Sequence, residues 1–204
     1  MPAIHYGLED QAFVVTGGSR GIGLEIAREL LAQGARVTIC GRKAEGLAAA
    51  AAELGAGPRL HTVAAHIAQE EDVERLFAEA REAFGRLDGL VNNVGMNIAT
   101  GAVDAEPSLW RKVIDSNLSG TYLCARKAGQ LMRAQGRGKI VSITSLAALR
   151  AAPAMGIYGV AKAGIEMLTR VLAQELAPFH IQVNAVAPGM VRTGFSRPFW
   201  STPE

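Results

Sequence analysis

Tyr158 and Lys162 stand four residues apart in the stretch GIYGVAKAG, residues 156–164. Residues i and i+4 of a helix share a face, so the two side chains can reach one cleft. A free tyrosine has a pKa of about 10 and is a poor acid at neutral pH. A lysine cation about 4 Å away favours a tyrosinate by about 4 kcal/mol at an effective dielectric constant of about 20, or about three pKa units. The spacing therefore indicates a tyrosine tuned for proton transfer, although an exposed Tyr–Lys pair would look the same.

A glycine-rich segment, TGGSRGIG (16–23), joins an apolar run to an amphipathic one. Gly17, Gly21 and Gly23 allow the backbone to approach a ligand closely, and a helix N-terminus offers unpaired N–H groups to phosphate. A tight turn is the alternative interpretation. The position after a strand and before a helix favours a dinucleotide site.

The residues after the second apolar run indicate which dinucleotide is bound. NAD sites usually carry Asp or Glu there, about 20 residues on, to bond the ribose 2′-OH. This chain has Arg42 and Lys43 instead, and Arg20 lies inside the glycine turn. These cations suit a 2′-phosphate and favour NADP(H). Lys43 fits equally well as the solvated start of a surface helix.

The elements that must position these residues alternate along the chain. Apolar runs predict strands at 12–17, 35–40, 59–65, 87–93, 139–144 and 181–188. Helical patterns cover 23–34, 44–57, 70–85, 107–134 and 154–177. Apolar strands separated by helices predict an α/β fold, a doubly wound parallel sheet of the Rossmann kind. We expect residues 1–204 to form a single NAD(P)-binding catalytic domain.

Composition excludes several classes of function. The net charge of +2 in 204 residues gives no basic field for nucleic acid. No apolar run approaches the roughly 20 residues of a membrane span, and no signal peptide is evident. The two cysteines, Cys40 and Cys124, are expected to be buried free thiols. We therefore expect a cytoplasmic protein, and we assign no metal ligands.

Further motifs stand in a fixed order: NNVG (92–95), SNLSG (116–120), Ser145 thirteen residues before Tyr158, and NAVAPGMVRTGF (184–195). With the glycine turn and YGVAK, they resemble the short-chain dehydrogenase/reductase family, and the chain is similar to its 3-oxoacyl-ACP reductase-like members. The resemblance implies an oxidoreductase that transfers hydride between NADP(H) and a ketone or secondary alcohol. The long helices imply a homodimer or homotetramer.

The resemblance also implies residue roles. Tyr158 would be the general acid/base, Lys162 would support it and bond the nicotinamide ribose, and Ser145 would bond the substrate oxygen with Tyr158. Asn117 would anchor a water on the proton path. The cofactor-binding residues implied are Gly17, Ser19, Arg20, Gly21, Ile22, Gly23, Arg42, Ile67, Asn92, Gly95, Tyr158, Lys162, Val191 and Thr193.

Two departures from the family pattern affect these expectations. His66 stands where the family usually has an Asp that bonds the adenine amino group. A neutral imidazole can accept one such bond, so we expect modestly altered adenine binding. The sequence also stops where relatives usually continue into a substrate-covering helix and a further strand. Either these 204 residues are part of a longer chain, or the pocket lacks its lid, and within residues 1–204 we expect no C-terminal strand and lid.

Two other functional classes stay open at this point. A non-catalytic NAD(P)-binding sensor or scaffold could use the same fold, but binding alone needs no acid such as Tyr158. An isomerase or dehydratase of a related branch is a third class, which the short length disfavours. Reductases that act on carrier-bound acyl chains tend to place basic residues beside the site entrance. This chain has Arg133 and Arg137 near there, but APFH (177–180) after the second long helix, so a free ketone or alcohol is at least as favoured as a carrier-bound one.

Overall fold

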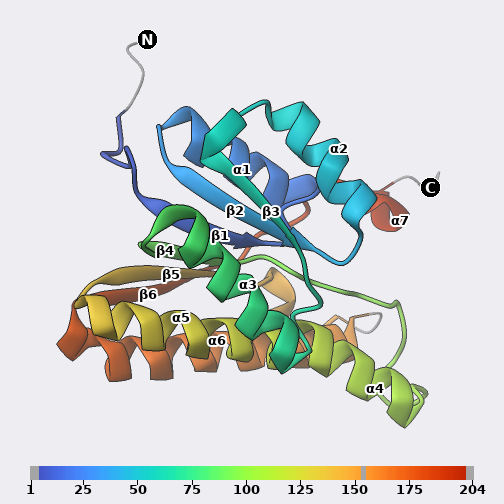
Figure 1. The fold of residues 1–204 in the computed structure, drawn as a ribbon. Coiled ribbons are helices and arrows are strands. Elements are labelled where there is room, and N and C mark those ends of the chain that lie inside the picture. Colours follow the sequence, from blue (N-terminus) through green and yellow to red (C-terminus); the bar gives the residue numbers. More distant parts are fainter. Residues whose placement is uncertain (1–4, 153–154, 201–204) are drawn as a thin grey trace.

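The computed structural model describes residues 5–152 and 155–200, and its centre is one parallel β-sheet (Figure 1). The strands are β1 (Ala12–Thr16), β2 (Arg36–Gly41), β3 (Leu60–Ala64), β4 (Gly89–Asn92), β5 (Gly138–Ile143) and β6 (Ile181–Val186). Their order in the sheet is β3-β2-β1-β4-β5-β6, and every neighbouring pair is parallel. The chain order reverses between β1 and β4, as in doubly wound folds.

Helices cover both faces of this sheet. Helices α1 (Gly21–Ala32) and α2 (Ala44–Leu54) lie on one side, and α3 (Glu70–Phe84), α5 (Gly120–Gln135) and α6 (Gly156–Leu176) lie on the other (Figure 1). Consecutive strand residues serve the two sides alternately. Val14 packs in the core with α3 and α5, whereas Phe13 and Val15 pack with α1 and α2. The predicted doubly wound α/β fold is confirmed.

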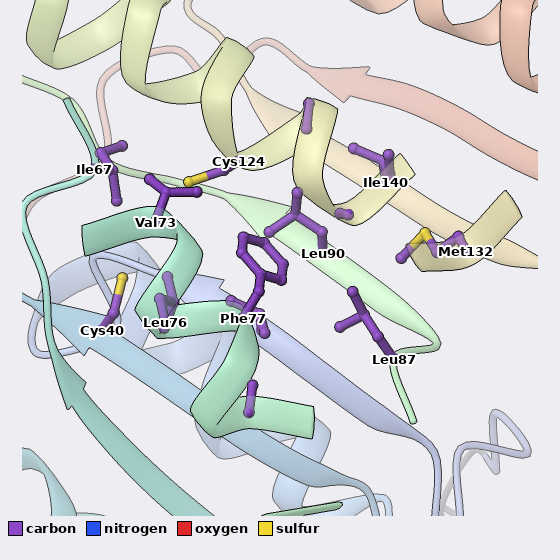
Figure 2. Packing of buried hydrophobic residues seen from close by; sticks show 14 of the residues in the cluster. Cys40, Ile67, Val73, Leu76, Phe77, Leu87, Leu90, Cys124, Met132 and Ile140 are labelled. Atoms are coloured by element: carbon purple, nitrogen blue, oxygen red, sulfur yellow. The ribbon is translucent and has the colours of Figure 1, made fainter. Parts of the chain in front are cut away.

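The core beneath α3 and α5 is apolar and fully enclosed. Figure 2 shows Phe77 of α3 beside Leu90 of β4 within this core. Cys40 and Cys124 belong to the same core, are both buried, and form no disulfide. Burial raises the pKa of the Cys40 thiol to about 12. The prediction of two buried free thiols is confirmed.

The predicted helix 107–134 is interrupted. Helix α4 (Pro107–Ile114) passes through a π-helical turn at Asp115–Ser119 before α5 begins. Such turns occur often at functional sites. Short helical segments occupy Gly57–Arg59, Leu146–Ala148 and Ala177–Phe179, and α7 spans Arg197–Trp200. In the described part of the chain, no helix is long and apolar enough to span a bilayer.

Candidate active site

The glycine turn lies at the carboxyl end of β1, where the strand order reverses. Gly17 and Gly21 have φ angles of +65° and +58°, which residues with a side chain rarely adopt. A Cβ on Gly23 would overlap the carbonyl oxygen of Gly17. Helix α1 begins with no side-chain cap from Arg20 and no acidic residue in its first turn. Its first N–H groups therefore remain available for a phosphate, and the turn fits the pyrophosphate of a dinucleotide.

An asparagine that the sequence analysis did not single out holds this turn in place. Asn93 Nδ2 donates to the carbonyl oxygens of Thr16 (3.1 Å) and Gly17 (3.2 Å). Its backbone N–H donates to the Thr16 hydroxyl at 3.0 Å. Asn92, which was expected near the adenosine, is buried, and its side chain points to Ser142 (3.4 Å). Residue types alone do not tell which of two adjacent asparagines faces the turn.

The end of β2 lies beside the same turn. A Cβ on Gly41 would lie 3.3 Å from the Ser19 hydroxyl oxygen. Arg42 follows Gly41 directly, and its side chain is exposed, as is that of Arg20. The structure therefore brings both expected phosphate-binding arginines to the rim of the glycine turn. Ile22, inside the turn, is half-buried.

His66 and Ile67 follow β3 along the same edge of the sheet. Ile67 is buried, whereas the imidazole of His66 is half-buried. The His66 Nδ1 accepts the N–H of Ala68 at 3.3 Å, so one ring nitrogen is already used. The backbone N–H of His66 donates to Asp72, and this bond, followed by that from Arg75, lowers the pKa of the Asp72 carboxyl. A neutral His66 with this contact presents an N–H donor rather than the acceptor expected for adenine.

Tyr158 and Lys162 lie one turn apart on α6 and are both buried, with 8% and 2% of their surfaces exposed. The Lys162 ammonium lies 5.6 Å from the centre of the Tyr158 ring and donates to the carbonyl oxygen of Ile143 at 2.8 Å. The Ser145 hydroxyl lies within hydrogen-bonding reach of Tyr158 and accepts the N–H of Ala147 at 3.1 Å. The three side chains expected to do chemistry converge at the carboxyl end of β5.

The expected tuning of the tyrosine is not present in this structure. Burial raises the pKa of Tyr158, and the hydrogen bond with Ser145 only partly opposes that rise. Burial also lowers the pKa of Lys162, to about 8. The charge of Lys162 alone favours a tyrosinate, but the loss of hydration on burial disfavours both charged forms. At neutral pH, Lys162 is still mostly a cation and can assist a developing tyrosinate.

Asn117 stands in the π-helical turn and is completely buried. Its Nδ2 donates to the carbonyl oxygens of Met96 and Val113, both at 2.8 Å, and its Oδ1 accepts the Met96 N–H at 3.1 Å. A Cβ on Gly95 would lie 3.5 Å from both Asn117 Oδ1 and Lys162 Nζ. Asn117 therefore holds the segment after β4 next to Lys162, while its expected role with a water molecule stays a prediction.

The segment after β6 closes over the site. Thr193 packs on the glycine turn, 3.5 Å from a Cβ built on Gly21, and the Phe195 ring lies 6.3 Å from that of Tyr158. Val191 is 45% exposed. Ser196, which the sequence analysis did not single out, is buried, accepts the Thr193 N–H at 3.0 Å and donates to the Val191 carbonyl oxygen. Ser196 thus fixes the shape of this loop.

Comparison with known proteins identifies the family to which the chain belongs. The profile of the family described as short chain dehydrogenase matches residues 11–204. The chain belongs to the short-chain dehydrogenase family. Members of this family use nicotinamide cofactors, in keeping with the glycine turn.

Relatives of this short-chain dehydrogenase match nearly its whole length. Human dehydrogenase/reductase SDR family member 4 is 36% identical over 199 residues, 97% of this chain and 72% of the human protein. The 3-oxoacyl-[acyl-carrier-protein] reductase of Synechocystis is 38% identical over 188 residues, covering 91% of this chain and 76% of that protein. The crystal structure of levodione reductase superposes with a TM-score of 0.91 at 32% identity, over 94% of this chain and 76% of that one.

Proposed function

We propose that this short-chain dehydrogenase transfers hydride between NADP(H) and a ketone or secondary alcohol, with Tyr158 as general acid/base. The observation that carries the proposal is the convergence of Tyr158, Lys162 and Ser145 at the carboxyl end of β5, at the same end of the parallel sheet as the glycine turn after β1. A protein that only binds a dinucleotide needs no buried acid, so the convergence disfavours a sensor or scaffold. Two of the similar proteins are named reductases, which supports the same reaction type.

Each residue then has a chemical task. The nicotinamide, when bound, supplies or accepts the hydride at the substrate carbon. Tyr158 gives its proton to the carbonyl oxygen during reduction and takes one back during oxidation. Ser145 bonds the same oxygen and fixes it in reach of the tyrosine. Lys162, a cation at neutral pH, stabilises the tyrosinate and bonds the nicotinamide ribose, and Asn117 keeps Gly95 and its neighbours against Lys162.

The preference for NADP(H) is tested by replacing Arg42 with Ala. Charge-assisted bonds to a 2′-phosphate contribute about 1–3 kcal/mol, so the variant is expected to bind NADPH about 5- to 150-fold more weakly. NADH lacks this phosphate, and its affinity should stay nearly unchanged. Fluorescence titration of both nucleotides with both proteins measures the four dissociation constants.

The wild-type titration also tests the cofactor assignment directly. NADPH is expected to bind tenfold or more tightly than NADH, and binding of neither nucleotide would contradict the proposal. The matched control is Arg81→Ala. Arg81 is exposed in the last turn of α3, near the amino ends of the strands and away from the glycine turn. An equal loss of NADPH and NADH affinity in Arg42→Ala would refute the role at the 2′-phosphate.

We also propose a homodimer or homotetramer formed through α5 and α6. Val160, Met167 and Val171 form an exposed apolar stripe on one face of α6, and Tyr122 is exposed on α5. Met167→Glu is expected to place a charge in the interface and lower the oligomeric mass measured by sedimentation. An unchanged mass would contradict this interface.

The free buried thiols Cys40 and Cys124 suit a reducing compartment, so we propose a cytoplasmic location.

A further inference from the structure

A third side chain continues the face of α6 that carries Tyr158 and Lys162. Glu166 lies one turn beyond Lys162, and all three side chains contact the stretch 143–145 at the carboxyl end of β5. The Glu166 contact is a hydrogen bond of 2.6 Å from the Thr144 hydroxyl to Oε1. Three successive turns of α6 therefore contact three consecutive residues of the chain. Thr144, the middle one, directly precedes the candidate catalytic Ser145.

Thr144 is held from two sides. It is 2% exposed, and its backbone N–H donates to the carbonyl oxygen of Val186 at 2.8 Å. Its hydroxyl lies 3.1 Å from the same oxygen and 2.6 Å from Glu166. The hydroxyl has one proton, and a bond to a carboxylate is shorter and stronger than one to a neutral carbonyl. Glu166 therefore fixes the Thr144 side chain.

The residues that follow have little room to adjust. Ser145 leaves the strand in an extended conformation and caps the short helix Leu146–Ala148 with its own hydroxyl. A Cβ on Gly159 would lie 2.8 Å from the carbonyl oxygen of Ala147, so α6 and this short helix are in close contact. The segment 144–147 is therefore packed tightly between β6 and α6.

We propose that Glu166 is a positioning residue that holds the Ser145 hydroxyl against Tyr158 through Thr144. This inference rests on the proposed function, in which Ser145 and Tyr158 together bond the substrate oxygen. Glu166 does not contact the reacting atoms itself. Its contribution is the alignment of Ser145.

The direct test measures the ionisation of Tyr158 in Glu166→Ala. The hydrogen bond with Ser145 lowers the pKa of Tyr158, so losing the alignment should raise that pKa, in the same direction as Ser145→Ala. Difference absorption of tyrosinate, referenced to Tyr158→Phe, reports this group alone and needs no turnover. Lys162, the charged neighbour of the Tyr158 ring, is unchanged in every variant, so its own substitution does not enter the comparison of the Tyr158 pKa values. An unchanged pKa would overturn the proposal.

Kinetics give a second readout. Glu166→Ala is expected to lower kcat by about 10- to 100-fold, because small displacements of a positioning group are costly, with little change in the affinity for NADPH. In a Ser145→Ala background the same substitution should add almost nothing. Fully additive losses would show that Glu166 acts independently of Ser145 and would also overturn the proposal.

Matched variants separate positioning from stability. Thr144→Val removes the hydroxyl and should raise the pKa of Tyr158 and lower kcat as Glu166→Ala does. It also serves as the test if Glu166→Ala does not fold. Thr144→Ser keeps the bond to Glu166 and should show the wild-type pKa of Tyr158. Glu175→Ala removes an exposed glutamate from the same helix and should leave both readouts unchanged. Should Thr144→Val match the wild type, the proposal fails. Absence of reductase activity in the wild type would count against the proposed function instead.

Discussion

Tyr158→Phe is expected to lower carbonyl reduction by about 10²- to 10⁴-fold, the usual contribution of a general acid. The substitution removes one hydroxyl from a side chain that is 8% exposed and keeps the ring that packs against Phe195. The glycine turn and Arg42 are untouched, so the dissociation constant for NADPH should change little. Steady-state rates at saturating NADPH, with a fluorescence titration of the same samples, measure both quantities.

The control for this prediction is Tyr6→Phe. Tyr6 is 59% exposed near the start of the chain, and its substitution removes the same atom far from β5. It should leave turnover unchanged. Turnover by Tyr158→Phe equal to that of the wild type would remove Tyr158 from the chemistry and leave the dinucleotide-binding sensor as the better reading.

The order of strands and helices could be predicted from the sequence because burial on both faces of a sheet leaves a strong pattern. The runs at 12–17, 35–40 and 139–144 each became a strand, with ends shifted by a residue or two. The π-helical turn at Asp115–Ser119 could not be predicted, since the stretch 107–134 has an unbroken helical pattern. The contacts of Asn117 in this turn are with the segment after β4, about 20 residues earlier in the chain, and a local pattern does not show them.

The candidate site was predictable where one element supplies both residues and less so where distant elements meet. Tyr158 and Lys162 share a helix, so their spacing alone indicated a common face. Asn93 and Glu166 depend on partners many residues away, in the glycine turn and at the end of β5. The direction of the pKa shift of Tyr158 was also missed, because hydration of the site depends on everything packed around it.

Lys162→Met is expected to make the protein more stable and less active. Burial lowers the pKa of Lys162 from 10.5 to about 8, which corresponds to about 3 kcal/mol of lost stability at neutral pH. Methionine has a similar length and no charge, so it removes this cost but also the hydrogen bond from the ammonium to the Ile143 carbonyl oxygen, worth about 1.5–3 kcal/mol because the donor is charged. The net gain of up to about 1.5 kcal/mol should raise Tm by up to about 6 °C, while turnover falls by about 100-fold or more.

The pH dependence of this stability difference identifies its origin. The folded protein releases the Lys162 proton near pH 8, whereas the unfolded chain keeps it up to about pH 10.5. Over that interval the unfolded state binds more protons, so the wild type gains stability as the pH rises. The advantage of Lys162→Met should therefore be largest below pH 8 and shrink towards pH 10.5. Urea unfolding of both proteins between pH 7 and 10 measures this difference, and a variant less stable than the wild type at pH 7 would show that Lys162 supports the fold. A shrinking advantage would instead show that the cost comes from keeping a buried cation beside Tyr158, as the proposed chemistry requires.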